Sequence, residues 1–253
     1  MKNFSKYAQY YNTLYKGKGY KKEADYVDRL IRQYSAKRNK TLLDIGCGTG
    51  NHDSWFLTKG YKVAGIDRSS KMISIAKNQK LPKTQIQFYT ASARSFVLPK
   101  KFDVAVSLFH VMSYLTTNEA VIDSLKNIYK HLIKDGLFIF DFWYGPAVLT
   151  QGPSLIVKNF MERENSIKRI ATPKINFNDN IVDINYRIEI RNKMNILKKS
   201  FTERHVMRYF FLPELYLMLK ITGFKALNCL EWLSLEKDVS QRSWSGVIIA
   251  KKE

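Results

Sequence analysis

A run of closely spaced glycines constrains the fold of this chain more than any other feature. The largely apolar residues 41–45 predict a short strand that carries one acid, Asp44. Three glycines at every second position then interrupt the strand, and a predicted helix follows: Gly46, Gly48 and Gly50. Glycine permits a sharp bend and lets a ligand approach the backbone with no side chain in between. The segment therefore predicts a ligand-binding turn between a strand and a helix.

A second acid indicates what this turn binds. The apolar residues 61–66 predict the next strand, which ends in Asp67, twenty-three residues after Asp44. An acid at that point can accept hydrogen bonds from both hydroxyls of a ribose. A dinucleotide motif would need its third glycine where this chain has Asn51, so the spacing argues against a pyrophosphate at the helix N-terminus. The pattern predicts a pocket for a different adenosine-bearing cofactor.

Strands and helices alternate through the first 150 residues. The predicted strands are 41–45, 61–66, 86–90, 102–108 and 136–142. The predicted helices are 20–38, 51–59, 69–77 and 117–133, with Ser69 or Ser70 as the cap of the third. Such alternation is typical of a parallel α/β sheet. The nearly unbroken apolar run at 102–108 is typical of a strand that is buried on both faces.

The pattern changes between about residues 155 and 210. Apolar and polar residues alternate through 181–190, and asparagine-rich turns at 178–180 and 192–193 flank this stretch. We interpret the region as an antiparallel insertion of three or four strands. A helix at 213–221 and two strands near 225–233 and 243–250 are expected to complete the chain.

The formal net charge of +20 is compatible with several kinds of partner. Of the 42 basic residues, 30 are lysine and only 12 are arginine, the residue that makes bidentate phosphate contacts, so nucleic-acid binding is not favoured. Basic residues outnumber acids eleven to three in residues 1–40 and twelve to six in residues 158–208. These flanks are either a solvated lysine surface or a rim that attracts an anionic small substrate.

The chain carries few signs of export or metal binding. No apolar run approaches the ~20 residues that a membrane span needs, and the first residues lack the apolar stretch of a signal peptide. Two cysteines, Cys47 and Cys229, predict neither a disulfide framework nor a zinc site. We therefore expect a cytoplasmic protein without a membrane span or a metal.

The segment 42–50 resembles motif I of the class I S-adenosylmethionine (SAM) methyltransferases. A closer resemblance is to the N-methyltransferases of nucleotide-linked amino sugars, which begin with a segment similar to residues 7–17 and carry antiparallel strands before the last helix. The resemblance implies a Rossmann-like, seven-stranded, mostly parallel sheet in the order 3-2-1-4-5-7-6, with strand 7 antiparallel. It also implies an inserted antiparallel β-sheet. The expected division is an N-terminal helical lid (1–40), a SAM-binding core (41–150 and 211–253) and an insertion on the substrate side (151–210).

The resemblance also implies roles for single residues. Asp44 would face the amino group of SAM and Asp67 its ribose, while Ser92 stands where related enzymes place an acid near the adenine. The full cofactor-binding set is Tyr11, Asp44, Gly46, Cys47, Gly48, Gly50, Asp67, Arg68, Met72, Ser92, Ala93 and Phe109. The expected catalytic residues are His110 and Tyr114. The expected substrate-binding residues are Tyr15, Asp141, Trp143, Tyr144, His205 and Arg208.

Several of these residues have a simpler alternative interpretation. Tyr11 and Tyr15 could serve aromatic packing alone, His205 could pack inside the insertion, and Arg208 could be a surface charge. Cys47 is interpreted as a small apolar filler.

The implied activity is methyl transfer to a small anionic acceptor, with S-adenosylhomocysteine as product. The acceptor favoured by the resemblance is the amino group of a nucleotide-linked sugar used in surface-polysaccharide synthesis. The alternatives are O-methylation of a capsular sugar, methylation of RNA, and SAM binding without catalysis. A homodimer is possible, and the sequence specifies neither the acceptor atom nor the number of methyl groups added.

Overall fold

A parallel sheet forms the centre of the computed structural model, which describes residues 6–35, 40–162 and 164–253. Its five parallel strands lie in the order β3-β2-β1-β4-β5. They are β1 (Thr41–Ile45), β2 (Lys62–Asp67), β3 (Ile86–Thr90), β4 (Phe102–Ser107) and β5 (Leu132–Tyr144). Successive strands are added to one side of β1 up to β3 and to its other side from β4 onward, so the strand order switches between β1 and β4. The carboxyl ends of the strands at such a switch point border the expected ligand crevice.

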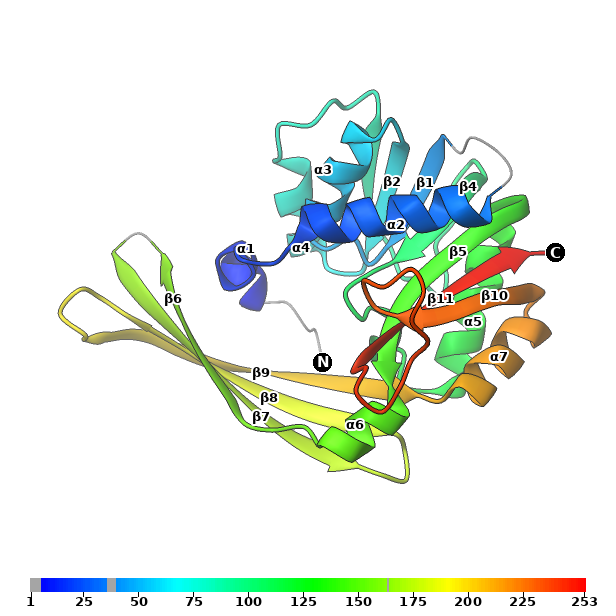
Figure 1. Ribbon diagram of the computed structural model, residues 1–253. Coiled ribbons are helices and arrows are strands. Elements are labelled where there is room, and N and C mark those ends of the chain that lie inside the picture. Colours follow the sequence, from blue (N-terminus) through cyan, green and yellow to red (C-terminus); the bar gives the residue numbers. More distant parts are fainter. Residues whose placement is uncertain (1–5, 36–39, 163) are drawn as a thin grey trace.

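The last two strands extend the sheet beyond β5 (Figure 1). Strand β11 (Ser245–Lys252) pairs antiparallel with β5, and β10 (Phe224–Glu231) pairs antiparallel with β11. Counted without the insertion, the order is 3-2-1-4-5-7-6 with the seventh strand antiparallel, which confirms the expected core topology.

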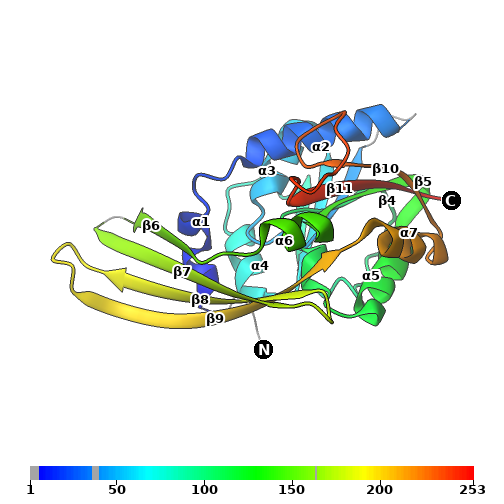
Figure 2. The same cartoon turned by 60° about the horizontal axis from the view of Figure 1, so that its bottom comes forward.

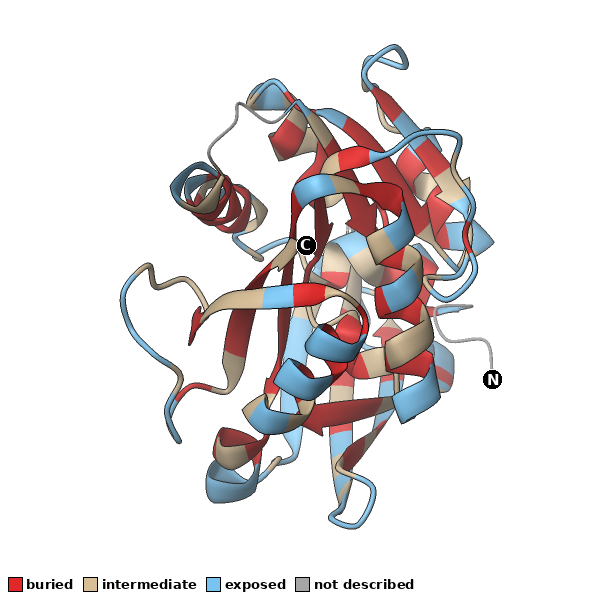
Figure 3. Cartoon of the chain, turned by 90° about the vertical axis from the view of Figure 1, so that its right-hand side faces the viewer, coloured by how far each residue is buried: buried red, intermediate tan, exposed pale blue. Residues whose placement is uncertain are grey.

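Helices cover both faces of this sheet, and buried residues concentrate on its strands (Figure 3). One face packs against α2 (Tyr20–Tyr34), α3 (Asn51–Thr58) and α4 (Ser70–Lys77), and the other packs against α5 (Asn118–His131) and α7 (Leu212–Ile221). Adjacent strand residues face opposite layers, so each strand needs apolar residues at every position. The predicted helix 20–38 ends at Tyr34, and residues 36–39 lie outside the described residues.

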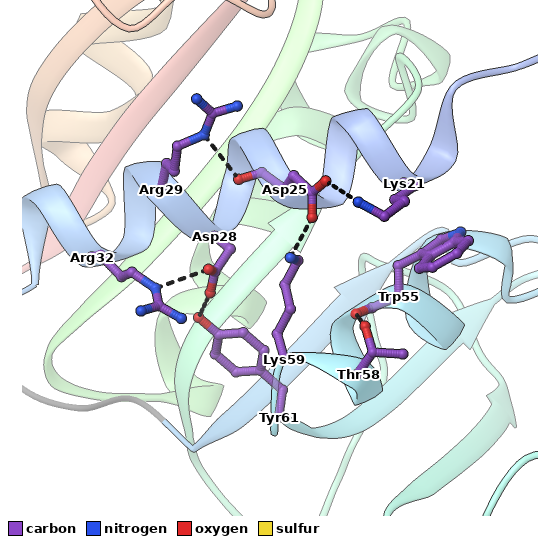
Figure 4. A network of polar contacts seen from close by, with 9 residues as sticks. All are labelled: Lys21, Asp25, Asp28, Arg29, Arg32, Trp55, Thr58, Lys59 and Tyr61. Carbon is purple, nitrogen blue, oxygen red and sulfur yellow. Dashed lines mark hydrogen bonds and ion pairs between the residues drawn. The ribbon is translucent and has the colours of Figure 1, made fainter.

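Polar contacts attach α2 to the core beneath it (Figure 4). Asp25 accepts from Lys21 at 2.8 Å and also bonds Lys59 at the end of α3. Asp28 accepts from the Tyr61 hydroxyl at 2.8 Å, and this pair is buried. These contacts fix the helix that follows the N-terminal segment against the helix that follows the glycine turn.

Four antiparallel strands form the insertion, as the alternation pattern predicted. They are β6 (Ile156–Glu162), β7 (Asn165–Asn176), β8 (Ile181–Arg191) and β9 (Leu197–Phe210), paired in sequence order. The insertion is continuous with the core sheet, because β9 pairs in parallel with the end of β5 through Tyr209 and Phe210. It projects from the core in Figure 1.

The sequence pattern missed some elements at this junction. Strand β5 is longer than the predicted 136–142, since Leu132 already pairs with Phe102. A short helix, α6 (Gly145–Gln151), was not predicted, and the expectation of three or four inserted strands did not give the bounds of β6. Most of β6 is exposed and has no apolar alternation, so its strand character depends on pairing with β7.

The N-terminal segment lies between the core and the insertion in both views (Figures 1 and 2). It contains a 3₁₀ turn, η1 (Tyr7–Tyr10), and α1 (Tyr11–Leu14). Its aromatic residues pack on the insertion around Ile167, Ile188 and Phe201. The Thr13 hydroxyl donates to Glu162 of β6 at 2.6 Å. Among the described helices, none has the length and apolar character to cross a membrane.

The N-terminus of α5 offers a test of the fold. Thr117 caps this helix by accepting from the Ala120 backbone N–H at 3.2 Å, and replacing such a cap by alanine costs about 1 kcal/mol. We expect Thr117→Ala to lower the free energy of unfolding by that amount in chemical denaturation. The neighbouring Thr116→Ala is the control and should leave the midpoint unchanged. Equal midpoints for all three proteins would contradict the cap.

Candidate active site

The glycine turn has the backbone conformation that its sequence requires. Gly46, Gly48 and Gly50 have φ values of 77°, 57° and 79°, a region that other residues rarely adopt. A side chain on Gly46 would meet Val111 at 2.5 Å, and one on Gly50 would meet Phe88 at 2.8 Å. Gly48 differs, since the nearest atom to its missing side chain is the Tyr11 hydroxyl at 4.0 Å. The open position at Gly48 is therefore where a ligand can approach the turn.

Asp67 lies directly against this turn. Its Oδ2 accepts from the Gly48 backbone N–H at 3.1 Å, and its Oδ1 accepts from the Ser69 N–H at 2.7 Å. Burial raises the pKa of Asp67, and these two backbone donors oppose that rise. A carboxylate oxygen accepts more than one hydrogen bond, so both oxygens keep capacity for a ribose diol. The structure thus brings the two predicted cofactor motifs together.

Two further carboxyls are buried beneath the turn. Asp44 is 2% exposed and Asp53 of α3 is 0% exposed, and the two carboxyls lie against each other. Apart from Asp44, no group among the described residues donates a hydrogen bond to either oxygen of Asp53. Burial raises the pKa of Asp53 to about 7, and burial together with Asp53 raises the pKa of Asp44 well above its usual range. The pair therefore holds a proton near neutral pH unless a cation lies beside it.

The N-terminal segment is tied to the same turn. Asn12 Oδ1 accepts from the Thr49 hydroxyl at 2.8 Å and from Asn51 Nδ2 at 3.1 Å. Lys18 forms an ion pair with Glu23, and its ammonium lies 4.1 Å from the ring centre of Phe109. The segment thus approaches the glycine turn from one side and the end of β4 from the other.

These features fit SAM. Its cationic methionine end suits the buried carboxyl pair, its ribose diol suits Asp67, and Gly48 leaves room for close approach. Cys47 is buried, and burial raises the pKa of its thiol well above the usual range, in agreement with a packing role. Among the described residues, no cluster of three or more metal-ligating side chains is present.

The predicted adenine contacts are arranged less clearly. Met72 is buried in α4, whereas Arg68 and Ser92 are exposed. The Ser92 hydroxyl accepts from the Arg94 backbone N–H at 3.3 Å. Ala93 is half-buried, and its carbonyl accepts from Asn127 at 3.3 Å. Adenine recognition by these four residues stays a prediction.

The loop after β4 has an unusual backbone. Phe109 and His110 have φ values of 65° and 62°, and two consecutive non-glycine residues in this region are strained. Asp141 holds the loop, because its two oxygens accept from the His110 backbone N–H at 3.0 and 3.1 Å. His110 Nδ1 lies 2.8 Å from Asp141 Oδ2. Strain that is kept in place by a buried acid is typical of a functional site.

Aromatic residues surround this loop. The Trp143 ring centre is 5.9 Å from that of His110, and the Tyr15 ring centre is 5.0 Å from that of Phe109. Tyr114 shares a 2.7 Å hydrogen bond with His205 Nδ1. The structure therefore gathers Tyr15, His110, Tyr114, Asp141, Trp143 and His205 around the ends of β4 and β5.

Tyr114 and His205 form a chain with one residue that the sequence did not indicate. His205 Nε2 lies 3.1 Å from Glu203 Oε1. Burial raises the pKa of Tyr114 well above its usual range, so its hydroxyl keeps the proton and donates to His205 Nδ1. The other imidazole nitrogen then donates to Glu203. This chain orients Tyr114 and leaves His110 as the freer proton acceptor.

Two predicted substrate residues are not part of this group. Arg208 was expected to bind the substrate, but it lies three positions after His205 on β9, so the two side chains are on opposite faces of the strand. Arg208 instead pairs with Glu214 at 2.6 Å. Tyr144 packs against the core layer that contains α5, whereas its neighbour Trp143 packs with Tyr114. Both placements follow from strand alternation, which the sequence analysis did not apply at these positions.

Comparisons with known proteins agree with this architecture. A family model described as a methyltransferase domain matches residues 42–136. A dTDP-3-amino-3,4,6-trideoxy-α-D-glucopyranose N,N-dimethyltransferase from Streptomyces venezuelae is 30% identical over 148 residues, 58% of this chain and 61% of that protein. A dTDP-3-amino-3,6-dideoxy-α-D-glucopyranose N,N-dimethyltransferase from Streptomyces fradiae is 27% identical over 57% of this chain and 56% of that protein. The chain thus spans about three fifths of these relatives.

Solved structures match over nearly the whole chain. DesVI of Streptomyces venezuelae has a TM-score of 0.80 at 21% identity and covers 98% of both chains. The sugar N-methyltransferase KedS8 of a Streptoalloteichus species has a TM-score of 0.81 at 19% identity, with 98% and 92% covered. At these identities the likeness concerns the fold. Residues 42–136 thus match a methyltransferase-domain model, and the whole chain shares its fold with SAM-dependent methyltransferases.

Proposed function

We propose that this chain transfers a methyl group from SAM to the amino group of a small nucleotide-linked sugar. One observation carries the proposal: Tyr11, which lies over Gly48 of the cofactor turn, packs on Tyr15, and Tyr15 packs on Phe109 of the strained loop at His110. The curated relatives support the acceptor class, since their names describe N,N-dimethyltransferases of dTDP-linked amino sugars. A role in surface polysaccharide, a cytoplasmic location and a homodimer stay predictions.

The chain's own residues would mainly hold the reactants in line. Bound SAM supplies a methyl group on a positive sulfur, which is already activated for displacement. Asp67 and the Asp44–Asp53 pair would fix the two ends of the donor, and Tyr11 lies over Gly48. Alignment of this kind can supply about 7 to 11 kcal/mol of the barrier reduction.

A proton must also leave the acceptor amine. His110 is the best-placed acceptor, because Asp141 holds its backbone N–H and lies 2.8 Å from its Nδ1, and its side chain is 19% exposed. Tyr114 is held by His205 and keeps its own proton, so we assign it a positioning role. An aromatic wall with polar ends suits a sugar ring.

The test is direct. Purified protein is incubated with SAM and a dTDP-linked amino sugar, and the products are measured by mass spectrometry. We expect S-adenosylhomocysteine together with a sugar that has gained one or two methyl groups on nitrogen. A matched hydroxyl sugar should react poorly. Methylation of the hydroxyl sugar alone would favour O-methylation, and turnover of neither would reject the proposal.

Binding of SAM should depend on pH in a defined direction. The Asp44–Asp53 pair holds a proton below about pH 7 in the free protein, and a bound cation favours the ionised form. Binding therefore releases a proton, so affinity should rise with pH through the region near 7 in which Asp53 ionises. Because one proton must leave before SAM binds, the affinity for SAM should fall about tenfold for each pH unit below 7.

Calorimetry at pH 5.5, 6.5 and 8 measures this effect. Asp53→Asn is the matched variant, because it keeps the shape of the side chain and removes one titrating group. We expect the pH dependence of its SAM affinity to become shallow. An equal dissociation constant at pH 5.5 and 8 in the unmodified protein would contradict the proton linkage.

A further inference from the structure

Arg169 is a buried cation that forms no ion pair with an acid of the described residues. It lies on β7 and is 8% exposed. Its NH1 donates to the Tyr7 hydroxyl at 2.9 Å. Three ring centres surround the guanidinium at 5.3 to 5.5 Å, those of Tyr15, Phe160 and Tyr186. Across the described residues, no carboxylate forms an ion pair with it.

This arrangement is uncommon. Arginine is almost never buried without an anionic partner, because removing a charge from water costs several kcal/mol. Cation–π contacts return about 2 kcal/mol or more each when they are desolvated, but they do not neutralise the charge. The other buried arginine, Arg208, shows the usual arrangement, since Glu214 pairs with it at 2.6 Å. The aromatic groups around Arg169 hold its guanidinium in place and leave its positive charge unneutralised.

Aromatic contacts connect Arg169 with the acceptor side of the site. Tyr15 contacts both Arg169 and the strained Phe109, with ring distances of 5.3 and 5.0 Å. Tyr7 contacts both Arg169 and His205, whose ring centre is 5.5 Å away. Two aromatic contacts thus separate the guanidinium from the loop that carries His110. Tyr7 and Tyr15 also share a 3.1 Å hydroxyl–hydroxyl contact beside the guanidinium.

We propose that Arg169 binds the pyrophosphate of the acceptor. This inference rests on the proposed function for the identity of the ligand, while the anion site itself rests on the geometry above. A guanidinium can bind phosphate oxygens through two parallel N–H donors, and the tyrosine hydroxyls supply further donors. The N-terminal segment would then contribute to both ends of the reaction, with Tyr11 at Gly48 and Tyr7 and Tyr15 at the phosphates.

A purely structural role is the competing explanation. In that case Arg169 would only fasten the N-terminal segment to the insertion through Tyr7 and Tyr15. Removing it would then affect stability and cofactor affinity together, without a selective effect on anions.

The experiment measures binding of inorganic pyrophosphate, dTDP and S-adenosylhomocysteine to the full chain by calorimetry. The variants are Arg169→Gln and Arg169→Lys, and the control is Lys168→Gln, which removes an exposed charge on the same strand. We expect Arg169→Gln to weaken dTDP and pyrophosphate binding by about 10- to 100-fold, the loss expected for a charged hydrogen-bond pair. Arg169→Lys should be intermediate. S-adenosylhomocysteine affinity should change little, and the control should bind all three as the unmodified chain does.

The outcomes separate this inference from the proposed function. If dTDP binding depends on Arg169 but no amino sugar is methylated, the anion site stands and the proposed function fails. If methylation occurs and Arg169→Gln leaves the dTDP affinity and the KM for the sugar nucleotide unchanged, the anion site is wrong. No binding of dTDP or pyrophosphate to the unmodified chain would also overturn it. Should Arg169→Gln fail to fold, Arg169→Lys gives the answer, because it keeps the charge and loses the two-pronged contact.

Discussion

Replacing Asp67 by alanine is expected to weaken SAM binding by about 100-fold or more. Each charged hydrogen bond from a ribose hydroxyl is worth about 1.5 to 3 kcal/mol, and Asp67 is placed to accept two. The same carboxylate also accepts from Gly48 at 3.1 Å and Ser69 at 2.7 Å, so its removal loosens the turn on which the cofactor lies. Calorimetric titration with SAM measures the effect, and thermal denaturation records any loss of stability separately.

Two further variants define the contribution of Asp67. Asp67→Asn retains the shape and one acceptor oxygen, and we expect a smaller loss of about tenfold. Asp123→Ala removes an exposed acid that pairs only with Arg94, and SAM binding should be unaffected. If Asp67→Ala binds SAM as tightly as the unmodified chain, the ribose assignment is wrong and the cofactor pocket must lie elsewhere.

The cofactor side could be predicted from the sequence because its signals are local. The glycine turn lies within nine residues, and strand pairing in parallel α/β sheets places the end of β2 beside the end of β1. The pairing of β1 with β2 therefore brings Asp67 close to Gly48 without any contribution from the rest of the fold. The order of the core strands was predictable for the same reason, since apolar runs and their connecting helices leave few arrangements.

The acceptor side could not be predicted to the same depth. Arg169 comes close to Tyr7 and Tyr15 only through the fold, across more than 150 residues, and a lone arginine in an alternating strand has no distinguishing pattern. Arg208 was chosen from its neighbours in sequence, and strand alternation turned it to the face opposite His205. Which face a residue occupies depends on register, and register is set by the pairing partner.

The contacts between buried polar residues could not be predicted from the sequence either. Asp53 follows the glycine turn in a segment for which the sequence predicts only a helix, and its contact with Asp44 depends on how that helix returns over β1. A role for Glu203 follows only from the structure, in which His205 lies between Glu203 and Tyr114 and bonds both. The sequence indicates which residue types are available, and packing determines which of them share a proton.

Replacing His110 by asparagine is expected to lower kcat by about 100- to 10,000-fold, the usual contribution of a positioned acid or base. Asparagine is chosen because it tolerates the left-handed backbone that His110 adopts at φ 62°, so the loop should keep its shape. It cannot accept a proton from the amine, and it leaves the cofactor contacts at Gly48 and Asp67 in place. Release of S-adenosylhomocysteine gives the rate, and calorimetry should show an unchanged affinity for SAM.

The neighbours of His110 make this prediction specific. Asp141→Asn keeps an oxygen for the loop backbone but removes the carboxylate charge 2.8 Å from the imidazole, so kcat should fall less than in His110→Asn. Tyr114→Phe removes the hydroxyl that donates to His205 and should mainly raise the KM for the acceptor. A His110→Asn enzyme with normal kcat, beside a Tyr114→Phe enzyme that has lost turnover, would assign the proton to the Tyr114–His205–Glu203 chain. His110 and Tyr114 lie in the same segment after β4, but their polar partners come from different strands, Asp141 from β5 and His205 from β9, so each variant removes a different hydrogen-bonding group.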